Sequence, residues 1–557
     1  MRHLSETLPV IEPSNISPTE QAQVPATLSQ DAGIVRAAAV VAVGNVVSRV
    51  LGLLREIVKS NMFGASPMLA AYTVAVLVPM TLFNLISGGE MVSSSLVPVF
   101  SDFAIKERRP ELWRLASAFL SLATIVLAII VILVEYFAPQ IAWLAGARNF
   151  EAPDLLPVTV QLMRLATPAV LFLSIASVLT GVLISLKRFT LPAFTTAVFN
   201  GTIVIVALIR PDKIDSLVWG ILLGSVLQVA MQLPGLRDGR LRPSFDWKHP
   251  ALRRIVILYA PIVVALIVNQ IAIWISYNLA ITTGDSSVTY MAYATTLYQF
   301  PLGLIVTALS IATLPTLSRL ATAFREAEED NASDAADRLA DYKETLAGGL
   351  RLVIALGLPA AAGLFALAQP IIALLLQHGQ FTAEDTTMTA VVLRIYLIGL
   401  GFAAVDQMLV FASYARKDTW RPALAGVISI AVYTVVAVLL LDQLGLLSLM
   451  VADAVKHIIH TAIMLFLLQR HVGGLAGYQI GPTVLKSVAA AIITGLAAAA
   501  TAGLLITFLN GDSFLERLII VVIAGAVGLA TYLVAAFALN LQDAKSLWNL
   551  LWNRLRA

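Results

Sequence analysis

Residues 115–134 read LASAFLSLATIVLAIIVILV, a stretch without a charged side chain. About 20 apolar residues in a helix span roughly 30 Å, the thickness of the hydrocarbon core of a bilayer. The stretch therefore predicts a transmembrane helix, and similar runs recur along the whole chain. Fourteen membrane spans are predicted, near residues 34–57, 68–89, 113–137, 156–185, 190–209, 215–235, 252–281, 287–311, 348–377, 386–414, 422–441, 444–468, 484–509 and 516–540.

The composition supports an all-α, polytopic membrane protein. Hydrophobic residues make up 59% of the 557 positions and charged residues only 13%, against about 25% charged in a soluble domain. A transmembrane β-barrel would instead show short segments of alternating polarity. The first 33 residues are polar and rich in Pro and Ser, which predicts a disordered tail.

Several classes of function are excluded or disfavoured. The chain has no cysteine, so a disulfide, a thiolate nucleophile and a cysteine metal site are impossible. We find no Gly-rich phosphate loop, no nucleophile elbow and no carboxylate pair in a soluble cleft, and we expect neither an enzyme nor a metal site. The net charge of +3 does not indicate nucleic-acid binding. A gradient-driven transporter is the simplest class that remains.

The distribution of Lys and Arg predicts the orientation. Loops after even-numbered spans carry most of the basic residues, as in KERR (106–109) and RKDTWR (416–421). Basic loops stay in the cytoplasm. Because the number of spans is even, both termini are predicted to be cytoplasmic.

Two pairs of segments indicate an internal repeat. LVPVFSDF (96–103) resembles TLPTLSRL (313–320), and KRFTLPAF (187–194) resembles RKDTWRPAL (416–424). Each repeat holds six spans, an even number, so the copies share one topology about a pseudo-two-fold axis along the membrane normal. The predicted layout is a cytoplasmic tail (1–33), an N-lobe (34–254), a C-lobe (255–470), and two final spans with a cytoplasmic tail (471–557).

The first span contains a polar stripe. Asn45, Arg49, Gly52 and Glu56 follow the spacing i, i+4, i+7, i+11, which places them along one helix face, with Arg55 beside it. An arginine at mid-bilayer costs at least about 2.5 kcal/mol, so the stripe should face a bundle interior or a wet cavity.

Two interpretations of the stripe stand side by side. In the functional one, Arg49 and Arg55 bind a phosphate-bearing headgroup and Glu56 is their partner or gate. In the structural one, Arg55 and Glu56 reach the outer interface and Arg49 pairs with Glu56. The depth of Arg49 in the span favours the cavity, whereas for Arg55 both interpretations stay open.

Other polar residues lie within predicted spans. Asp453, Lys456, His457 and His460 share one helix face, so they could relay protons, respond to the membrane potential, or form a self-neutralised cluster. A metal-ligand pair is disfavoured because a lysine lies among the ligands. For Arg164 and Arg394, structural pairing is the default interpretation. The candidates for cavity or coupling roles are Asn269, Gln270, Arg394, Asp406, Asp453 and Lys456.

Several of these stretches resemble one known family. SRVLGLLREIV (48–58), YQFPLGLIVTALSIATLPTLSRL (298–320) and YARKDTWRPAL (414–424) are similar, in order, to the MurJ/MviN lipid II flippases of the multidrug/oligosaccharidyl-lipid/polysaccharide exporter superfamily. The resemblance implies translocation of undecaprenyl-pyrophosphate-linked disaccharide-pentapeptide from the inner to the outer leaflet by alternating access. It also implies two six-helix lobes around a central cavity, with a lipid-tail groove at about 484–540.

The resemblance extends to partners and residues. Arg49 and Arg55 match two arginines that line the family's cavity, and Glu56 stands where the family usually has Asp. The implied partners are a lipid-linked glycan and membrane lipids, with no nucleic acid, for a monomer in the bacterial inner membrane. No cofactor is implied, and coupling to Na⁺, H⁺ or the membrane potential is left open.

The chain departs from the family pattern at two places. Phe83 and Asn84 stand where a basic pair is usual in the second span, and Thr295 and Thr296 stand where the eighth span commonly has Asp-Arg. Three alternatives therefore remain: a transporter of another polyprenyl-linked glycan, an exporter of amphipathic drugs by cation antiport, and a non-transporting scaffold that acts through its tails.

Overall fold

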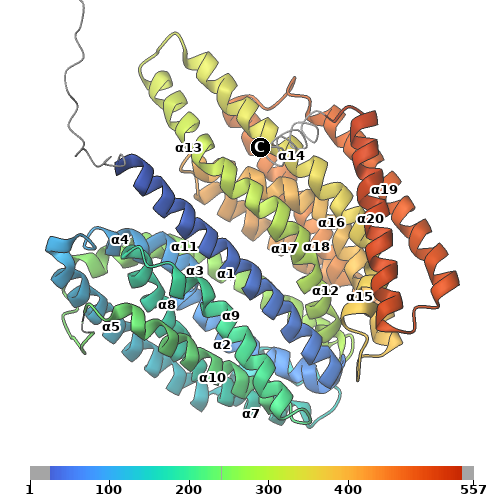
Figure 1. Cartoon of the computed structure of the whole chain (residues 1–557), viewed down its shortest axis with the longest axis horizontal. Helices are drawn as coiled ribbons and strands as arrows, with labels where there is room; N and C mark the ends of the chain where they lie inside the picture. Colours follow the sequence, from blue (N-terminus) through green and yellow to red (C-terminus); the bar gives the residue numbers. More distant parts are fainter. Residues whose placement is uncertain (1–25, 240, 542–557) are drawn as a thin grey trace, which may run out of the picture.

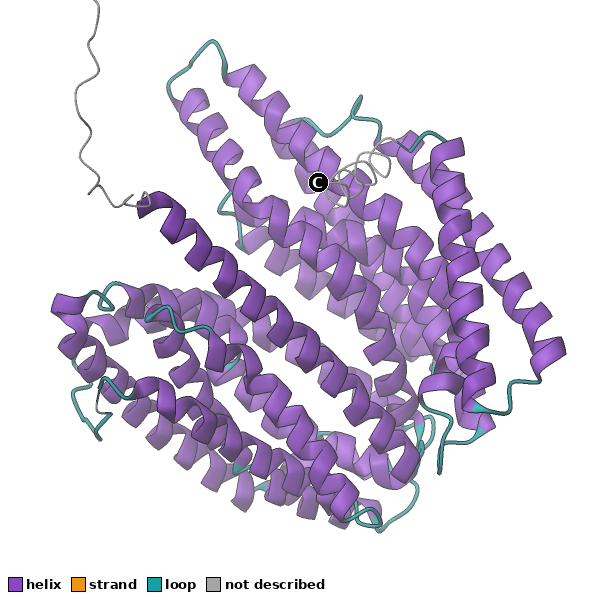
Figure 2. Ribbon diagram, in the orientation of Figure 1, coloured by secondary structure: helices purple, strands orange, loops and turns teal. Residues whose placement is uncertain are grey.

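The computed structural model describes residues 26–239 and 241–541, and all regular secondary structure in these residues is helical. Figures 1 and 2 show two groups of helices on either side of a long diagonal helix, α1, and a further helix pair against the second group. The predicted all-α membrane fold is confirmed. A disordered tail was predicted for residues 1–33. Residues 1–25 lie outside the described part of the chain, whereas residues 26–33 belong to helix α1, which begins at Ala26.

The chain forms an N-lobe, a C-lobe and a C-terminal pair. The N-lobe contains α1 (Ala26–Phe63), α2 (Pro67–Ser87), α3 (Gly89–Met91), η1 (Val92–Leu96), α4 (Val97–Ser101), η2 (Lys106–Arg108), α5 (Arg109–Tyr136), α6 (Ala138–Leu144), η3 (Ala147–Asn149), α7 (Leu155–Ala166), α8 (Ala169–Ser185), α9 (Thr190–Ile209), α10 (Asp215–Gln232) and η4 (Leu233–Leu236). The C-lobe contains α11 (Pro250–Ile281), α12 (Ser287–Pro301), η5 (Leu302–Thr307), α13 (Ala308–Glu329), α14 (Ala335–Ala366), α15 (Ala368–Leu375), α16 (Ala383–Ala415), α17 (Trp420–Leu444) and α18 (Leu447–Val472). The pair is α19 (Ile480–Leu509) and α20 (Phe514–Ala538).

The helices match the predicted spans closely. Thirteen segments among the described residues are long and apolar enough to cross a membrane, and α1 supplies the first predicted span. Local sequence explains several of the helix starts. Ser66 accepts a hydrogen bond from the N–H of Leu69 at the start of α2, and capping boxes begin α16 at Thr382 and α20 at Ser513.

Three predicted spans differ from the observed helices. The span predicted at 348–377 is wrong at its end, because α14 stops at Ala366 and α15 is a separate short helix. The span at 156–185 is interrupted between α7 and α8, next to Pro168. The span at 68–89 continues to Ser101 through the π-helical turn η1, and its counterpart η5 follows Pro301, which has no N–H to donate.

The internal repeat is visible in matching contacts of the two lobes. Nε of Arg164 donates to the backbone oxygen of Glu135, 29 residues earlier, and Nε of Arg394 donates to that of Phe365, also 29 residues earlier. The turns after α8 and α16 each place a lysine in the left-handed region, at φ 60° for Lys187 and 63° for Lys417. The lobes are therefore pseudo-symmetric copies of one six-span unit.

The two lobes meet at one end of the molecule and separate toward the other. One cluster of buried apolar side chains includes residues of both lobes near the C-terminal end of α1. At the other end each lobe has its own cluster, which in the N-lobe also includes the first turns of α11. Figure 1 shows the same divergence between α4 and α13. We call these the closed end and the open end.

Hydrogen bonds to backbone oxygens join the two lobes at the closed end. The N–H of Gln380 donates to the oxygen of Asn61 over 2.9 Å, and the hydroxyl of Tyr293 donates to the oxygen of Gly64 over 3.4 Å. A Cβ added to Gly64 would lie 2.5 Å from the oxygen of Gln380, and one added to Gly379 would lie 2.2 Å from the oxygen of Asn61. The two glycines therefore permit a close approach that no other residue would allow.

Candidate functional site

Helix α1 packs on α9, and its polar stripe runs along the edge of this contact. Gly44 allows the close packing, because a Cβ there would lie 2.4 Å from the backbone oxygen of Ala193. Asn45 and Arg49 remain exposed at the edge of this contact. The stripe predicted from the sequence therefore divides into an exposed part near the open end and a buried part near the closed end.

Arg49 and Asn45 form the exposed part. Both line a cavity of about 440 Å³ between α1, α8 and α9, together with Ser48, Thr180 and Thr196. The guanidinium of Arg49 also reaches the C-lobe, where a Cβ built on Gly303 of η5 would lie 3.5 Å from Nη2. Among the described residues, no carboxylate lies within ion-pair distance of Arg49. Its positive charge is available to an anion at the boundary between the lobes.

Glu56 lies in the buried part and is held by two cations. Its Oε1 accepts from Nη2 of Arg55 over 2.8 Å and its Oε2 accepts from Nζ of Lys59 over 2.6 Å. The residue is only 6% exposed. The structural interpretation from the sequence is corrected here: Glu56 neither pairs with Arg49 nor extends to an interface. It is the centre of a closed triad of net charge +1.

Two residues of this region were missed as site residues in the sequence. Asn200 of α9 accepts from Nη1 of Arg55 over 3.0 Å and donates to the backbone oxygen of Ser48 over 3.3 Å. Lys59, which the sequence placed in a loop, lies in α1 with Nζ 5.9 Å from the ring centre of Tyr72 and 5.8 Å from that of Tyr293. The only signal for Asn200 was a lone amide in an apolar span.

The C-lobe contains a second charged cluster between α16 and α18. Asp453 pairs with Lys456 over 2.5 Å, and Asp406 of α16 contacts Nδ1 of His460. His457 lies between the two carboxylates, with Nε2 3.7 Å from Asp453 and Nδ1 4.0 Å from Asp406. The shared face predicted on α18 is present, and Asp406 joins it from the neighbouring helix.

The other polar candidates are separate from both clusters. Gln270 accepts a hydrogen bond from the hydroxyl of Thr81 in α2 over 3.0 Å, whereas the neighbouring Asn269 is exposed. Arg394 makes its carbonyl contact at the end of α14 and lines a different cavity. The candidate residues thus fall into four places rather than one.

The positions that depart from the family pattern carry no compensating cation. Asn84 is exposed and its backbone oxygen accepts from the hydroxyl of Tyr259. The hydroxyl of Thr296 donates to its own helix, at the oxygen of Ala292. In the described part of the chain, Arg49 is the basic side chain that remains unpaired beside the 440 Å³ cavity.

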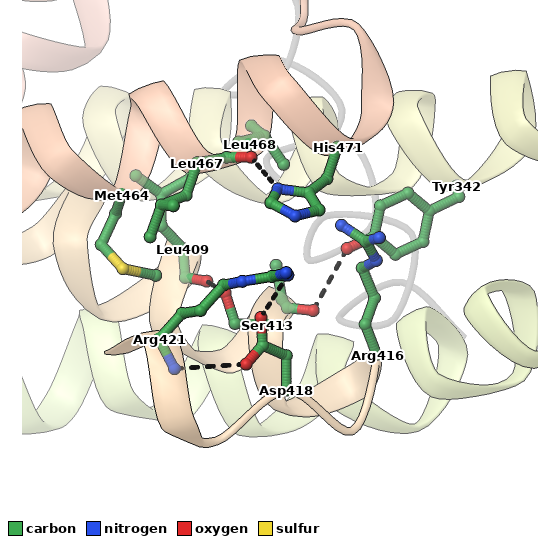
Figure 3. Close-up of a pocket in the computed structure, with 11 residues that line it drawn as sticks. Tyr342, Leu409, Ser413, Arg416, Asp418, Arg421, Met464, Leu467, Leu468 and His471 are labelled. Atoms are coloured by element: carbon green, nitrogen blue, oxygen red, sulfur yellow. Dashed lines mark hydrogen bonds and ion pairs between the residues drawn. The ribbon is translucent and has the colours of Figure 1, made fainter. Parts of the chain in front are cut away.

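A further polar pocket lies where the α16–α17 turn meets the end of α18 (Figure 3). Arg421 donates to Asp418 over 3.1 Å, and Nδ1 of His471 lies 2.5 Å from the backbone oxygen of Leu467. The enclosed space is about 20 Å³, which is room for about one water molecule. This pocket cannot hold a substrate headgroup.

Comparisons with known proteins agree with this architecture. The family model "Lipid II flippase MurJ" matches residues 59–522. A probable lipid II flippase MurJ of Bdellovibrio bacteriovorus is 28% identical over 451 residues, covering 79% of this chain and 83% of its own length. The lipid II flippase MurJ of Burkholderia cenocepacia is 30% identical over 385 residues, covering 67% of this chain and 72% of its own.

Solved structures share the fold. A lipid II flippase MurJ in an inward closed conformation has a TM-score of 0.70 at 23% identity, covering 89% of this chain and 97% of its own. An inward-facing MATE multidrug transporter has a TM-score of 0.60 at 13% identity, covering 76% and 94%. Since the family model spans most of the sequence, the chain belongs to the lipid II flippase MurJ family.

Proposed function

We propose that this protein moves lipid II, the undecaprenyl-pyrophosphate-linked peptidoglycan precursor, from the inner to the outer leaflet of the bacterial inner membrane. The observation that carries the proposal is Arg49, a cationic side chain without a carboxylate partner at the boundary between two lobes. An arginine fork is well suited to two oxygens of a pyrophosphate. The triad of Arg55, Glu56 and Lys59 adds a net positive charge behind it.

The two ends of the molecule suit alternating access. At the closed end the lobes share a buried apolar cluster and interlobe hydrogen bonds, and at the open end each lobe has its own core. Rocking of rigid lobes would break the contacts of Asn61 with Gln380 and form new ones at the open end. The substrate at Arg49 would then face the opposite side.

We further propose that the open end faces the cytoplasm. The support is the excess of Lys and Arg in the loops at this end, from which both termini are predicted to be cytoplasmic. In this orientation the cavity at Arg49 receives lipid II from the leaflet in which it is made. The protein would act as a monomer among membrane lipids, with a lipid-linked glycan as its partner.

The charged cluster of the C-lobe is our candidate for energy coupling. Asp406 and Asp453 are bound by His460 and Lys456, and His457 lies between them. Lys456 already pairs with one carboxylate, so fewer oxygen ligands are free for Na⁺. A histidine of the cluster can take up a proton instead. We therefore propose coupling to protons or to the membrane potential, without a cofactor.

A binding experiment tests the main proposal. Purified protein should bind lipid II, and Arg49→Ala should weaken binding by at least about tenfold, because a charge-assisted hydrogen bond contributes about 1.5–3 kcal/mol. Arg49→Lys should retain part of the affinity. Arg164→Ala is the matched control, because that arginine bonds a backbone oxygen away from the cavity. Normal lipid II binding by Arg49→Ala, with failure of the wild type to restore growth after flippase depletion, would contradict the proposal.

A separate experiment tests coupling. In proteoliposomes, Asp406→Asn should bind lipid II like the wild type but lose stimulation of transport by an imposed proton gradient or potential. A Na⁺ gradient alone should stimulate neither protein. Full stimulation of Asp406→Asn would remove the C-lobe cluster from the mechanism.

A second candidate substrate is another polyprenyl-linked glycan. The observation in its favour is the absence of basic side chains at Phe83, Asn84, Thr295 and Thr296, which lowers the positive charge available to a pyrophosphate. Competition between lipid II and a second undecaprenyl-linked glycan for the purified protein decides between the two. Stronger binding of the second glycan would favour the alternative.

A further inference from the structure

The repeated arginines Arg164 and Arg394 have different surroundings in the two lobes. Each donates Nε to a backbone oxygen 29 residues earlier, at the end of the preceding long helix. In the N-lobe that residue is Glu135, whose carboxylate interacts electrostatically with Arg164. In the C-lobe it is Phe365, whose ring centre lies 5.9 Å from Cζ of Arg394. The C-lobe has therefore kept the arginine and has an aromatic residue in place of the acidic one.

A cavity lies beside Arg394. Helices α19 and α20 pack against α14 and α15, as Figure 1 shows at the edge of the C-lobe. They enclose about 340 Å³, a size at the lower end of the range for ligand pockets. Among the described residues, no helix covers α5 and α6 in the same way. The pocket is thus a product of the C-terminal pair.

A second arginine enters the same cavity from the start of α20. Arg517 donates Nε to the oxygen of Gly511 over 2.8 Å, and Nη1 to the oxygens of Ala373 and Gln377 over 3.1 and 2.9 Å. These acceptors are backbone carbonyls, which hold the guanidinium in place without cancelling its charge. In the described part of the chain, no ion pair involves Arg394 or Arg517.

The rest of the wall is mainly apolar, with the two polar side chains Gln369 and Asn510. It consists mainly of Ala366, Ala373, Ala499, Ala502, Gly503 and Ile506. A Cβ added to Gly503 would meet nothing within 4 Å, so the glycine opens onto free space. Two fixed positive charges above a wall of small apolar residues suit an anionic headgroup attached to a hydrocarbon chain.

We propose that this pocket binds the phosphate-bearing headgroup of a lipid in the leaflet at the closed end, with Arg394 as the main ligand and Arg517 as the second cation. The chain of the lipid lies along Gly503 and its apolar neighbours. The occupant is an anionic phospholipid of the membrane or a polyprenyl phosphate. The site is separate from Arg49 and does not depend on the proposed transport function.

Native mass spectrometry of the full-length protein in detergent tests the site. The probes are phosphatidylglycerol, undecaprenyl phosphate and neutral diacylglycerol, titrated one at a time. Arg394→Gln should weaken retention of a phosphate-bearing lipid by about tenfold or more, the loss expected for a charge-assisted contact. Arg164→Gln, which removes the equivalent carbonyl bond in the other lobe, should bind as the wild type does.

A second variant keeps both charges. Gly503→Leu fills free space in α19 and improves helix propensity, so it should fold and still lose the bound lipid. Arginine-dependent binding of phosphatidylglycerol identifies a membrane phospholipid, and dependence with undecaprenyl phosphate alone identifies the transported class of lipid. The proposal would be overturned if Arg394→Gln and Arg164→Gln weakened lipid retention equally. It would also be overturned if diacylglycerol were retained as well as the phosphate-bearing lipids.

Discussion

The two lobes share one architecture but place their charges differently. In the N-lobe the charges lie on the opening helix α1, with Arg49 at the lobe boundary and Arg55, Glu56 and Lys59 behind it. In the C-lobe the opening helix α11 contributes only the amides Asn269 and Gln270 to the candidates, and the charges lie inside, between α16 and α18. The two lobes share one backbone arrangement, and we propose that their charges have different roles.

This division separates two requirements of a transporter. A substrate site must be reachable from the boundary that opens and closes, and Arg49 lies there. A coupling site needs a protected environment in which the protonation of one group changes the packing of its neighbours, and the cluster around Asp406 and Asp453 lies in such a place.

Removing the central carboxylate of the N-lobe triad should have the largest effect on stability. Glu56→Gln leaves Arg55 and Lys59, whose side chains are 31% and 13% exposed, next to each other without a counter-charge, which costs up to about 3–5 kcal/mol. Thermal unfolding in detergent measures the loss. Asp453→Asn in the C-lobe leaves only Lys456 without its partner and should cost less. Glu90→Gln, an exposed carboxylate, is the control, and a loss there equal to that of Glu56→Gln would refute the argument.

Widening the closed end should shift the balance between conformations. Gly379→Ala places a Cβ 2.2 Å from the oxygen of Asn61, so the two lobes must separate, and the state closed at this end should lose about 1–3 kcal/mol. Spin-label distances between the lobes measure the shift. Gly445→Ala controls for backbone strain, because Gly445 has φ +52° like Gly379 at +57° but a Cβ there meets nothing within 4 Å. Unchanged distances in Gly379→Ala would show that these contacts do not hold the lobes together.

Crowding Arg49 from the opposite lobe should weaken binding without removing a charge. Gly303→Leu adds a side chain next to Nη1 and Nη2 of Arg49 and should lower lipid II affinity about tenfold, the loss of roughly one good contact. The measurement is equilibrium binding to purified protein. Gly363→Leu is the matched control in the same lobe, because a Cβ at Gly363 meets nothing within 4 Å. Equal affinities of the two variants would place the headgroup away from the lobe boundary.

The fold was largely predictable from the sequence because the signal is local. An apolar run long enough for the bilayer forms a helix wherever it occurs, and the predicted span 190–209 coincides with α9. The errors came from proline and from π-helical turns, as at the end of α14 and in α2–α4, where hydropathy is continuous although the helix is not.

The site was only partly predictable because its contacts join distant segments. The spacing of Arg49 and Asn45 placed them on one face, but helical periodicity could not show that the same stripe becomes buried at Glu56. Asn200 is 145 residues from Arg55, and Asp406 is 54 residues from His460. No pattern within one span indicates such partners. Phe365 of the C-lobe corresponds to Glu135 of the N-lobe, and the sequence alone did not show that this difference lies beside a pocket.

The smallest predicted effect concerns Asn200, the link between α1 and α9. Asn200→Leu removes the acceptor for Nη1 of Arg55 and should cost about 1–1.5 kcal/mol, the low end for a charged donor, because Arg55 keeps its two bonds to Glu56. The corresponding position of α17 is Ile430, an apolar side chain that cannot form a hydrogen bond. Ile430→Leu should therefore change thermal stability by less than about 0.5 kcal/mol.

The same variant also tests binding. Asn200→Leu should lower the affinity for lipid II only if Arg55 moves, and by less than Arg49→Ala does. If Asn200→Leu abolished binding, Arg55 rather than Arg49 would be the principal contact of the headgroup, and the charge that matters would lie in the buried part of the stripe.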